Sequence, residues 1–140
     1  MKYHFKISQD SNRYFSKCVE LNNCTAEGST LEEIEKNMEE ELNLFLSKYQ
    51  KEMPIFPLPD NLKSGESLVE VKVNPQIAFG VILKHIRNKN NLTQAEAAQK
   101  IGFKSTYSYQ KYEKKSNPRL STINKIIKLF PDFPVELIYS

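Results

Sequence analysis

The hydrophobic pattern of the chain changes at Asn74-Pro75, and this change sets the fold class. Before it, apolar and polar residues alternate in 68–73, the period of a β-strand with one buried face. After it, Asn74 can cap a helix whose first position is Pro75, where the missing amide hydrogen is not needed. We therefore predict an α+β protein with two domains, 1–74 and 75–140, and almost no linker between them.

The first half carries the pattern of a small antiparallel sheet. Residues 2–21 alternate on both sides of a turn at 10–12, which predicts a β-hairpin with Phe15, Val19 and Leu21 on the buried face of its second strand. Asn22-Asn23 predicts a second turn before a short strand over 24–27. With the strand at 68–73 and the helix described next, the order of elements is βββαβ.

A helix is predicted after Gly28, because Thr30 and Glu33 have capping-box spacing. Its apolar stripe consists of Leu31, Ile34, Met38, Leu42, Phe45 and Tyr49. The next segment contains Pro54, Pro57 and Pro59, which do not fit a helix interior, so we expect an extended connection there.

The second half predicts four short helices. The first starts at Pro75 and runs through 80–90, and the second is Gln94–Ile101, with Thr93 and Glu96 as a capping box and Gly102 as its left-handed end. The third is Thr106–Lys114 after the cap Ser105, and the fourth is Ser121–Leu129. Ala97 and Ala98 allow a close helix crossing. Short helices joined by a brief turn containing glycine are typical of a helix-turn-helix.

Charge divides the chain at the same place. Residues 1–75 contain 9 basic and 13 acidic residues, a net of −4, whereas 76–140 contain 11 and 4, a net of +7. The stretch 80–130 alone carries +9, which favours phosphate binding. The acidic half favours a basic partner, and the alternative for both halves is scattered surface charge.

Other classes of protein are excluded by composition and spacing. The longest apolar stretch, Ile77–Leu83, is too short to cross a membrane, and the opening ten residues do not resemble a secretory signal. Cys18 and Cys24 are too few for a disulfide framework and fit a reducing, cytoplasmic location. Asp10, Glu20, Glu27 and Glu70 do not form a nuclease carboxylate cluster, and His4 and His85 lack metal-ligand spacing. We predict no catalysis, no metal and no cofactor.

The DNA-contacting residues are expected on and around the third helix of the second half. Gln110 is the best candidate to read a base, because glutamine can pair with adenine through two hydrogen bonds. Gln94, at a helix N-terminus, can donate to a phosphate. The other candidates for the major groove are Ser105, Thr106, Tyr107, Ser108 and Lys111, and those for phosphate are Lys104, Lys114, Lys115 and Arg119. Tyr109 and Tyr112 should pack inward.

From Phe79 to Leu137 the chain resembles helix-turn-helix domains of the phage-repressor (Xre/Cro) type. The resemblance rests on LTQAEAAQKIG, YQKYE and SNPRLSTI. The turn before Glu113 is one residue longer than usual, and Lys115 stands where glycine is common.

The first half is similar to the HicB antitoxins of type II toxin–antitoxin modules. The resemblance rests on YHFKI and CVELNNCTAEGSTLEEIEKNMEEELNLFL, with Asn22-Asn23 replacing the usual Pro-Gly turn. GFKSTYSYQKYE also resembles the HicB subset that carries a helix-turn-helix. The resemblance implies a degraded ribonuclease-H-like fold that binds and masks a HicA-type toxin, which cleaves mRNA, and a C-terminal domain that represses the operon by binding double-stranded operator DNA.

The surface that would face a toxin is predicted from charge. The candidates are Glu20, Asn22, Asn23, Glu32, Glu35 and Glu39. The apolar tail Phe130–Ser140 either forms a homo-dimer (or higher homo-oligomer) or closes the helical core. Two alternative functions remain. One is a stand-alone phage-type repressor whose N-terminal domain senses a small molecule, although that half leaves little room for a pocket. The other is an active nuclease with its own DNA-binding module.

Overall fold

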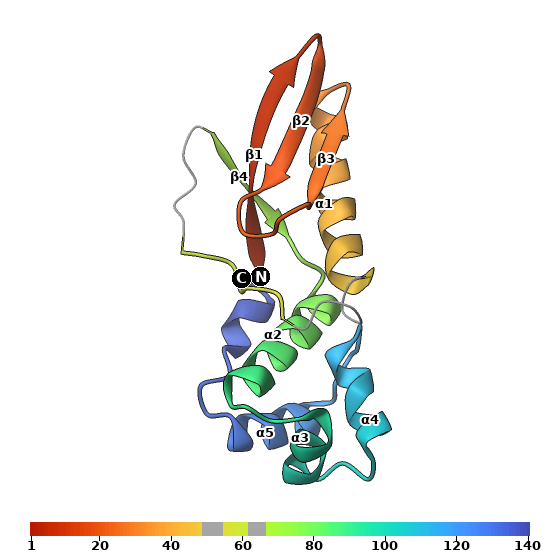
Figure 1. Cartoon of the computed structure of the whole chain (residues 1–140), viewed down its shortest axis with the longest axis vertical. Helices are drawn as coiled ribbons and strands as arrows, with labels where there is room; N and C mark the ends of the chain where they lie inside the picture. Colours follow the sequence, from red (N-terminus) through yellow and green to blue (C-terminus); the bar gives the residue numbers. More distant parts are fainter. Residues whose placement is uncertain (49–54, 62–66) are drawn as a thin grey trace.

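The structure, a computed structural model, describes residues 1–48, 55–61 and 67–140. Two units lie end to end (Figure 1): an N-terminal unit of a sheet and one long helix, and a helical unit formed by the second half of the chain. The two chain termini lie side by side between the units. The predicted α+β class is confirmed.

The sheet of the N-terminal unit has four strands. These are β1 (Lys2–Asp10), β2 (Arg13–Cys18), β3 (Thr25–Gly28) and β4 (Leu68–Lys72). They lie in the order β3-β2-β1-β4, and each neighbouring pair is antiparallel. Ser11 and Asn12 both have positive φ, as a two-residue hairpin turn requires, and Asn23 has φ of 68° in the next turn.

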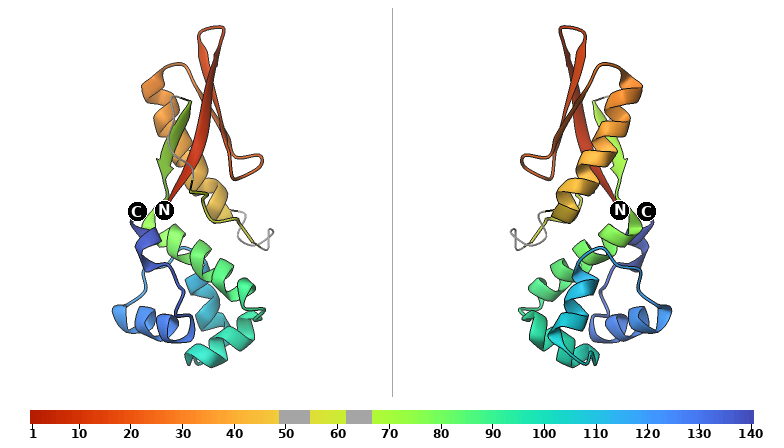
Figure 2. Two further views of the ribbon diagram at one scale, coloured as in Figure 1. Left: turned by 90° about the vertical axis from the view of Figure 1, so that its left-hand side faces the viewer. Right: turned by 90° about the vertical axis from the view of Figure 1, so that its right-hand side faces the viewer.

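Helix α1 (Leu31–Lys48) covers one face of the sheet (Figure 2). The Glu33 amide donates to Thr30 Oγ1 at 3.1 Å, so the predicted cap forms. The buried side chains of α1 are Ile34, Met38, Leu42 and Leu46. Leu31, predicted in this stripe, lies in the first turn of the helix and is 54% exposed. Tyr49 and Pro54 lie outside the described residues.

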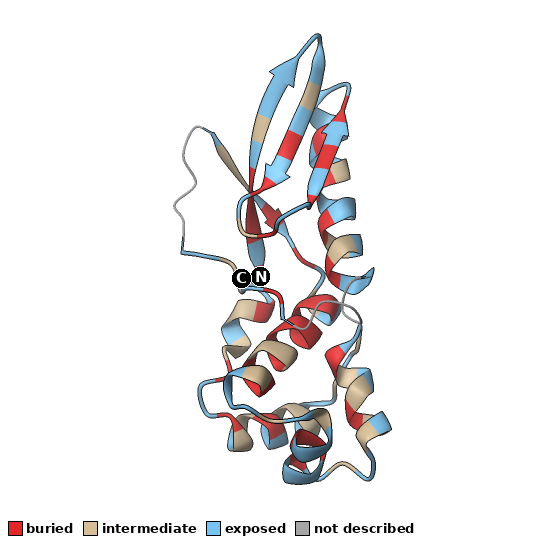
Figure 3. Cartoon of the chain, in the orientation of Figure 1, coloured by how far each residue is buried: buried red, intermediate tan, exposed pale blue. Residues whose placement is uncertain are grey.

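The predicted buried face of β2 is wrong. Burial alternates along this strand (Figure 3), but Ser16 and Cys18 face α1, whereas Phe15 and Val19 are 38% and 48% exposed. The register with β1 decides this, because Cys18 lies opposite buried Phe5 and therefore shares its face. Leu21 is buried, but beyond the end of the strand.

The helical unit contains the predicted helices. They are α2 (Pro75–Lys89), α3 (Gln94–Ile101), α4 (Thr106–Gln110) and α5 (Leu120–Leu129), with two 3-10 helices, η2 (Lys111–Glu113) and η3 (Val135–Ile138). Side chains of Asn74, Thr93 and Ser105 cap α2, α3 and α4, and Gly102 ends α3 with φ of 99°.

The third predicted helix is shorter than expected, because its last turn tightens into η2. This turn lies directly against α2 at Gly80, where a Cβ atom would collide with the carbonyl oxygens of Glu113 and Lys114. Only glycine permits so close an approach of two backbones.

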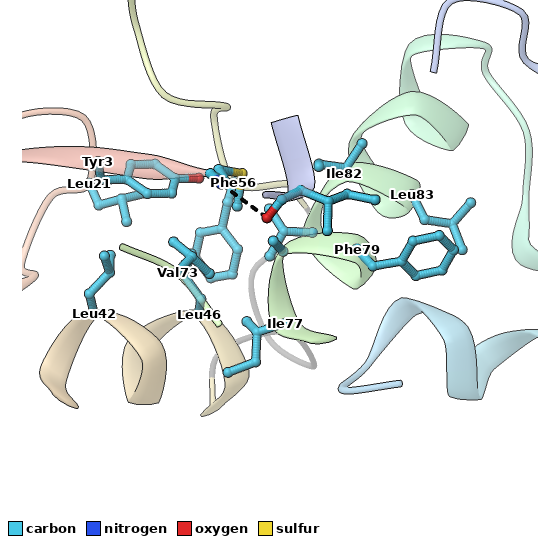
Figure 4. Packing of buried hydrophobic residues seen from close by; sticks show 14 of the residues in the cluster. Tyr3, Leu21, Leu42, Leu46, Phe56, Val73, Ile77, Phe79, Ile82 and Leu83 are labelled. Atoms are coloured by element: carbon cyan, nitrogen blue, oxygen red, sulfur yellow. Dashed lines mark hydrogen bonds between the residues drawn. The ribbon is translucent and has the colours of Figure 1, made fainter. Parts of the chain in front are cut away.

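One core continues from the sheet into the helical unit. Val73 and Ile77 link the residues under α1 to Phe79 and Leu83 of α2 (Figure 4). The two units are therefore packed against each other through buried apolar side chains.

Polar contacts also hold the junction. The Asn43 side chain of α1 donates to the Lys72 carbonyl at 3.2 Å and accepts from the Asn74 amide at 2.7 Å. The amine of Met1 donates to the carbonyls of Ile138 and Ser140, both at 3.1 Å.

The tail packs on its own chain. Phe133 and Ile138 are buried, while Tyr139 stays 73% exposed. Of the two roles considered for the tail, this arrangement supports closure of the core. Among the described residues, no helix is long and apolar enough to cross a membrane.

Candidate nucleic-acid interface

A buried carboxylate, Glu113, organises the helix-turn-helix. Arg87 of α2 donates from Nε to Glu113 Oε1 and from Nη2 to Oε2, the latter at 3.3 Å. Tyr109 of α4 donates its hydroxyl to Oε1 at 2.7 Å, and Gln94 of α3 donates to Oε2 at 2.8 Å. Since the Arg87 and Glu113 side chains are only 9% and 4% exposed, this network joins three helices inside the domain.

The pKa values in this network follow from burial and charge. Burial opposes the charge of Arg87, but the hydrogen bond and charge of Glu113 outweigh it and raise the pKa of the guanidinium. Burial first, and then Glu113, raise the pKa of Tyr109 well above its usual value. The phenol therefore stays protonated and can donate.

Gln94 connects this network to the predicted base-reading residue. The Gln110 side-chain amide donates to Gln94 Oε1 at 2.9 Å, while Gln94 Nε2 donates to Glu113. Gln110 is half-buried and its amide nitrogen already has an acceptor. The geometry thus holds Gln110 in one orientation at the end of α4.

The exposed face of α4 carries two kinds of side chain. Ser105 accepts from the Ser108 amide at 3.1 Å, and the two hydroxyls lie 2.9 Å apart, so this pair forms the helix cap. Tyr107 is 68% exposed, and Lys111 Nζ lies 4.9 Å from its ring centroid. Tyr107 and Lys111 therefore project together beside the half-buried Thr106.

Tyr109 is fully buried and Tyr112 half-buried, as predicted. Their rings lie 5.7 Å and 5.1 Å from that of Phe103, between centroids. Through Tyr109, this aromatic cluster packs α4 against the rest of the helical unit.

The predicted phosphate-binding cations flank the same helix. Lys104, Lys114, Lys115 and Arg119 are all exposed. Within the described part of the chain, none of them forms an ion pair with a carboxylate. Their charges are thus available to an anionic polymer.

The predicted toxin-facing residues do not all lie at the surface. Glu32, Glu35 and Glu39 of α1 are exposed, as are Asn22 and Asn23. The Glu20 side chain, however, is 1% exposed.

Glu20 is turned inward because donors converge on its carboxylate. Its oxygens lie 2.8 Å from the His4 ring nitrogen Nδ1, 2.8 Å from the His4 amide and 3.2 Å from the Asp60 amide. A buried carboxylate requires such partners, so Glu20 serves the fold rather than an exposed binding surface.

The remaining strand carboxylates are spread over the sheet. Glu27 lies 3.7 Å from Arg13, and Glu70 lies 3.2 Å from Lys2. Within residues 1–48, 55–61 and 67–140, no group of three or more His, Cys, Asp or Glu side chains is placed to hold a metal ion.

Sequence reasoning did not identify Arg87 and Glu113 as the residues that join α2, α3 and α4. They are 26 positions apart, and no local pattern connects them. The spacing of Tyr109 and Glu113 on one helical face was the available signal.

Comparison with known proteins agrees with this geometry. Residues 83–136 match the model of a family described as Helix-turn-helix. No curated protein matches the chain. The C-terminal part of the chain is thus a helix-turn-helix domain, of the kind that binds DNA in transcription regulation.

Proposed function

We propose that this protein is a cytoplasmic antitoxin that represses its own operon through the helix-turn-helix and masks a HicA-type mRNA-cleaving toxin through its N-terminal domain. The observation that carries the DNA-binding half is the support of α4 by Glu113, with Tyr107 and Gln110 on α4 and Lys111 directly after it. Neither role requires catalysis or a cofactor.

DNA binding follows from two sets of side chains. Lysines around α4 neutralise phosphates and release counterions, which supplies affinity for any sequence. The side chains on α4 reach the base edges of the major groove. Two copies, as a homo-dimer, would contact half-sites about 34 Å apart.

Toxin binding is supported by the acidic outer face of α1. Glu32, Glu35 and Glu39 are exposed there, and α1 and α4 lie in different halves of the molecule (Figure 1). A ribonuclease that grips RNA presents basic residues, so an acidic face speeds encounter and competes with RNA. Toxin and DNA could bind at the same time.

Gel-shift titrations with operator and random DNA test the first half. Gln110→Ala should cost about 1–3 kcal/mol at one base pair and leave random DNA unaffected. Lys114→Ala, the matched control, should weaken both DNAs evenly and reduce the salt dependence by about one phosphate contact. If Gln110→Ala binds both DNAs like the wild type, Gln110 does not read a base.

Co-expression tests the second half. The partner is the short, basic, histidine-containing protein expected from the adjacent reading frame. It should co-purify with the full chain, and reversal of Glu32, Glu35 and Glu39 to lysine should abolish this. Glu136→Lys, on the helical unit, is the control and should retain the partner. If the triple variant still retains the partner, the toxin binds a surface other than the acidic face of α1. If no such partner co-purifies with the wild type, a stand-alone repressor is favoured.

A concave surface supports the second candidate function, a stand-alone repressor that senses a small molecule. A concavity of about 880 Å³ is lined by side chains of β1, β2 and β3, among them Lys6, Phe15, Lys17 and Glu27, and by Asn37 and Glu41 of α1. The N-terminal half therefore has more room than its length indicates, and the Lys and Glu side chains in the lining suit a charged small molecule. A ligand-sensing repressor would release operator when ligand is added, and Phe15→Ala with Lys17→Ala would remove the response but not operator binding.

A further inference from the structure

Two cysteines lie opposite each other where β2 ends and just before β3 begins. The β2–β3 register pairs Lys17 with Thr25, so the next opposed pair is Cys18 and Cys24. The Cys18 amide donates to the Cys24 carbonyl at 2.9 Å. Opposed residues of antiparallel strands have Cα atoms about 4.5–5.5 Å apart, inside the range of about 4.4–6.8 Å that disulfides span. A bond between these sulfurs therefore requires little backbone movement.

The two thiols differ in their surroundings. A hydrogen bond from the Cys24 thiol, and then the backbone amides of Leu21 and Glu20, outweigh burial and lower the pKa of Cys18. The same hydrogen bond, together with burial, raises the pKa of Cys24. Glu20 Oε1, 3.9 Å from the Cys18 sulfur, opposes the thiolate but does not reverse this asymmetry. Cys18 is thus the better nucleophile of the pair.

Accessibility points the same way. Both cysteines are free and buried, but Cys18 keeps 8% of its surface exposed and Cys24 keeps 2%. A small oxidant therefore meets Cys18 first, and Cys24 stands beside it as the second thiol. This arrangement of a reactive and a resolving cysteine is typical of oxidation-sensitive sites.

We propose that Cys18 and Cys24 form a redox modification site, at which a hydroperoxide converts the two thiols into an intramolecular disulfide. The Cys18 thiolate, having released its proton to solvent, attacks one peroxide oxygen. The O–O bond breaks, and the leaving hydroxide takes the Cys24 proton to form water. The Cys24 thiolate then attacks the sulfenic sulfur of Cys18, the S–S bond forms, and the S–O bond breaks. The second hydroxide takes a proton from solvent, so two thiols and hydrogen peroxide become one disulfide and two waters.

The disulfide would close the loop 18–24, which carries the exposed Asn22 and Asn23. It would restrict the turn between β2 and β3 without contact with the helix-turn-helix. The site is thus separate from DNA binding, and its test does not depend on the proposed partner.

The test uses the full-length wild-type chain in its native state. The protein is treated with hydrogen peroxide, quenched, denatured and alkylated, and its intact mass and peptide map are measured. We expect a loss of two hydrogen atoms, a peptide pair joined at Cys18 and Cys24, and full reversal by dithiothreitol. Retention of both thiols, or over-oxidation without a disulfide while circular dichroism shows a folded protein, would overturn the proposal. So would a disulfide whose yield rises with protein concentration, because it would join two chains.

Two single variants assign the roles. Cys24→Ser should stop at the sulfenic acid of Cys18, which dimedone traps, whereas Cys18→Ser should react at least about tenfold more slowly. Should either variant fold poorly, differential alkylation of the wild type at early times gives the same information, with Cys18 modified before Cys24. Equal rates at the two cysteines would contradict the assignment.

Discussion

The two halves of the molecule each bury a carboxylate, and the partners of these carboxylates differ in kind. Glu113 is held by the side chains of Arg87, Tyr109 and Gln94, which come from three helices. Glu20 is held by the His4 ring and by the backbone amides of His4 and Asp60. The first network joins three helices of the helix-turn-helix, whereas the second ties a turn and an extended connection to the inner strand β1.

This difference shows that the two buried carboxylates have different structural roles. Backbone donors around Glu20 are fixed by the sheet and by the path of the chain, so the carboxylate follows the fold. The side-chain donors around Glu113 come from α2, α3 and α4 and link these helices to one another. Removing Glu113 should therefore disturb both stability and DNA recognition, and removing Glu20 should disturb stability alone.

The largest effect is expected from Glu113→Ala. It leaves the buried guanidinium of Arg87 without a counter-charge, and such losses destabilise by about 3–5 kcal/mol. Urea unfolding followed by circular dichroism measures this change in the free energy of unfolding. The exposed Glu136→Ala is the control and should change it by less than about 0.5 kcal/mol. A small loss for Glu113→Ala would mean that Arg87 reaches water or another acceptor.

Glu20→Ala should destabilise by about 2–3 kcal/mol. The loss is smaller because removal of Glu20 leaves no buried guanidinium, which always keeps its charge, without a partner. Operator binding at a temperature where the variant is folded should match the wild type. Glu27→Ala, which removes only an exposed carboxylate of the same sheet, serves as the matched control. Impaired DNA binding by folded Glu20→Ala would show that the two halves are coupled.

Tyr109→Phe should destabilise by about 1.5 kcal/mol at neutral pH, since Glu113 loses one donor. Its dependence on pH separates it from the other variants. Because the pKa of Tyr109 is raised in the folded state, its contribution is complete below the unfolded value of about 10 and is lost as the pH rises above it. Unfolding titrations between neutral pH and pH 11 should therefore show a shallower loss of stability for Tyr109→Phe than for the wild type.

The smallest effect is expected from Asn43→Ala, which removes the side chain that joins α1 to the start of α2. The loss should be about 1 kcal/mol, and Ser47→Ala on the same helix is the control. If both halves unfold in one transition in the wild type but in two in Asn43→Ala, this amide couples them.

The parts of the fold that could be predicted from the sequence are those with local causes. Thr93, Ser105 and Asn74 cap the predicted helices, and Gly102 takes the left-handed conformation at the end of α3. These signals depend on a few neighbouring residues, so tertiary packing does not alter them. The exposed cations near α4 were likewise identifiable from charge and spacing.

The failures have a common cause in long-range contacts. Apolar residues occur on both faces of β2, so hydropathy alone predicted that Phe15 and Val19 are buried. Pairing with β1 instead places Ser16 and Cys18 on the buried face. Glu20 looked like an exposed turn residue, but Asp60, which donates to it, is 40 positions away. Pattern alone cannot locate a partner at that separation.

The sequence by itself determined the α+β class, the change from strand to helix at Asn74 and the helix-turn-helix, because caps, turns and periodicity are properties of short segments. Tertiary structure decided which face of β2 is buried, that Glu20 is internal, and that Gln110 is held by Gln94, which in turn donates to Glu113. It also brought Cys18 beside Cys24. Each of these depends on how separate elements pair or cross, where burial and hydrogen-bond satisfaction select one arrangement among several that local preference allows.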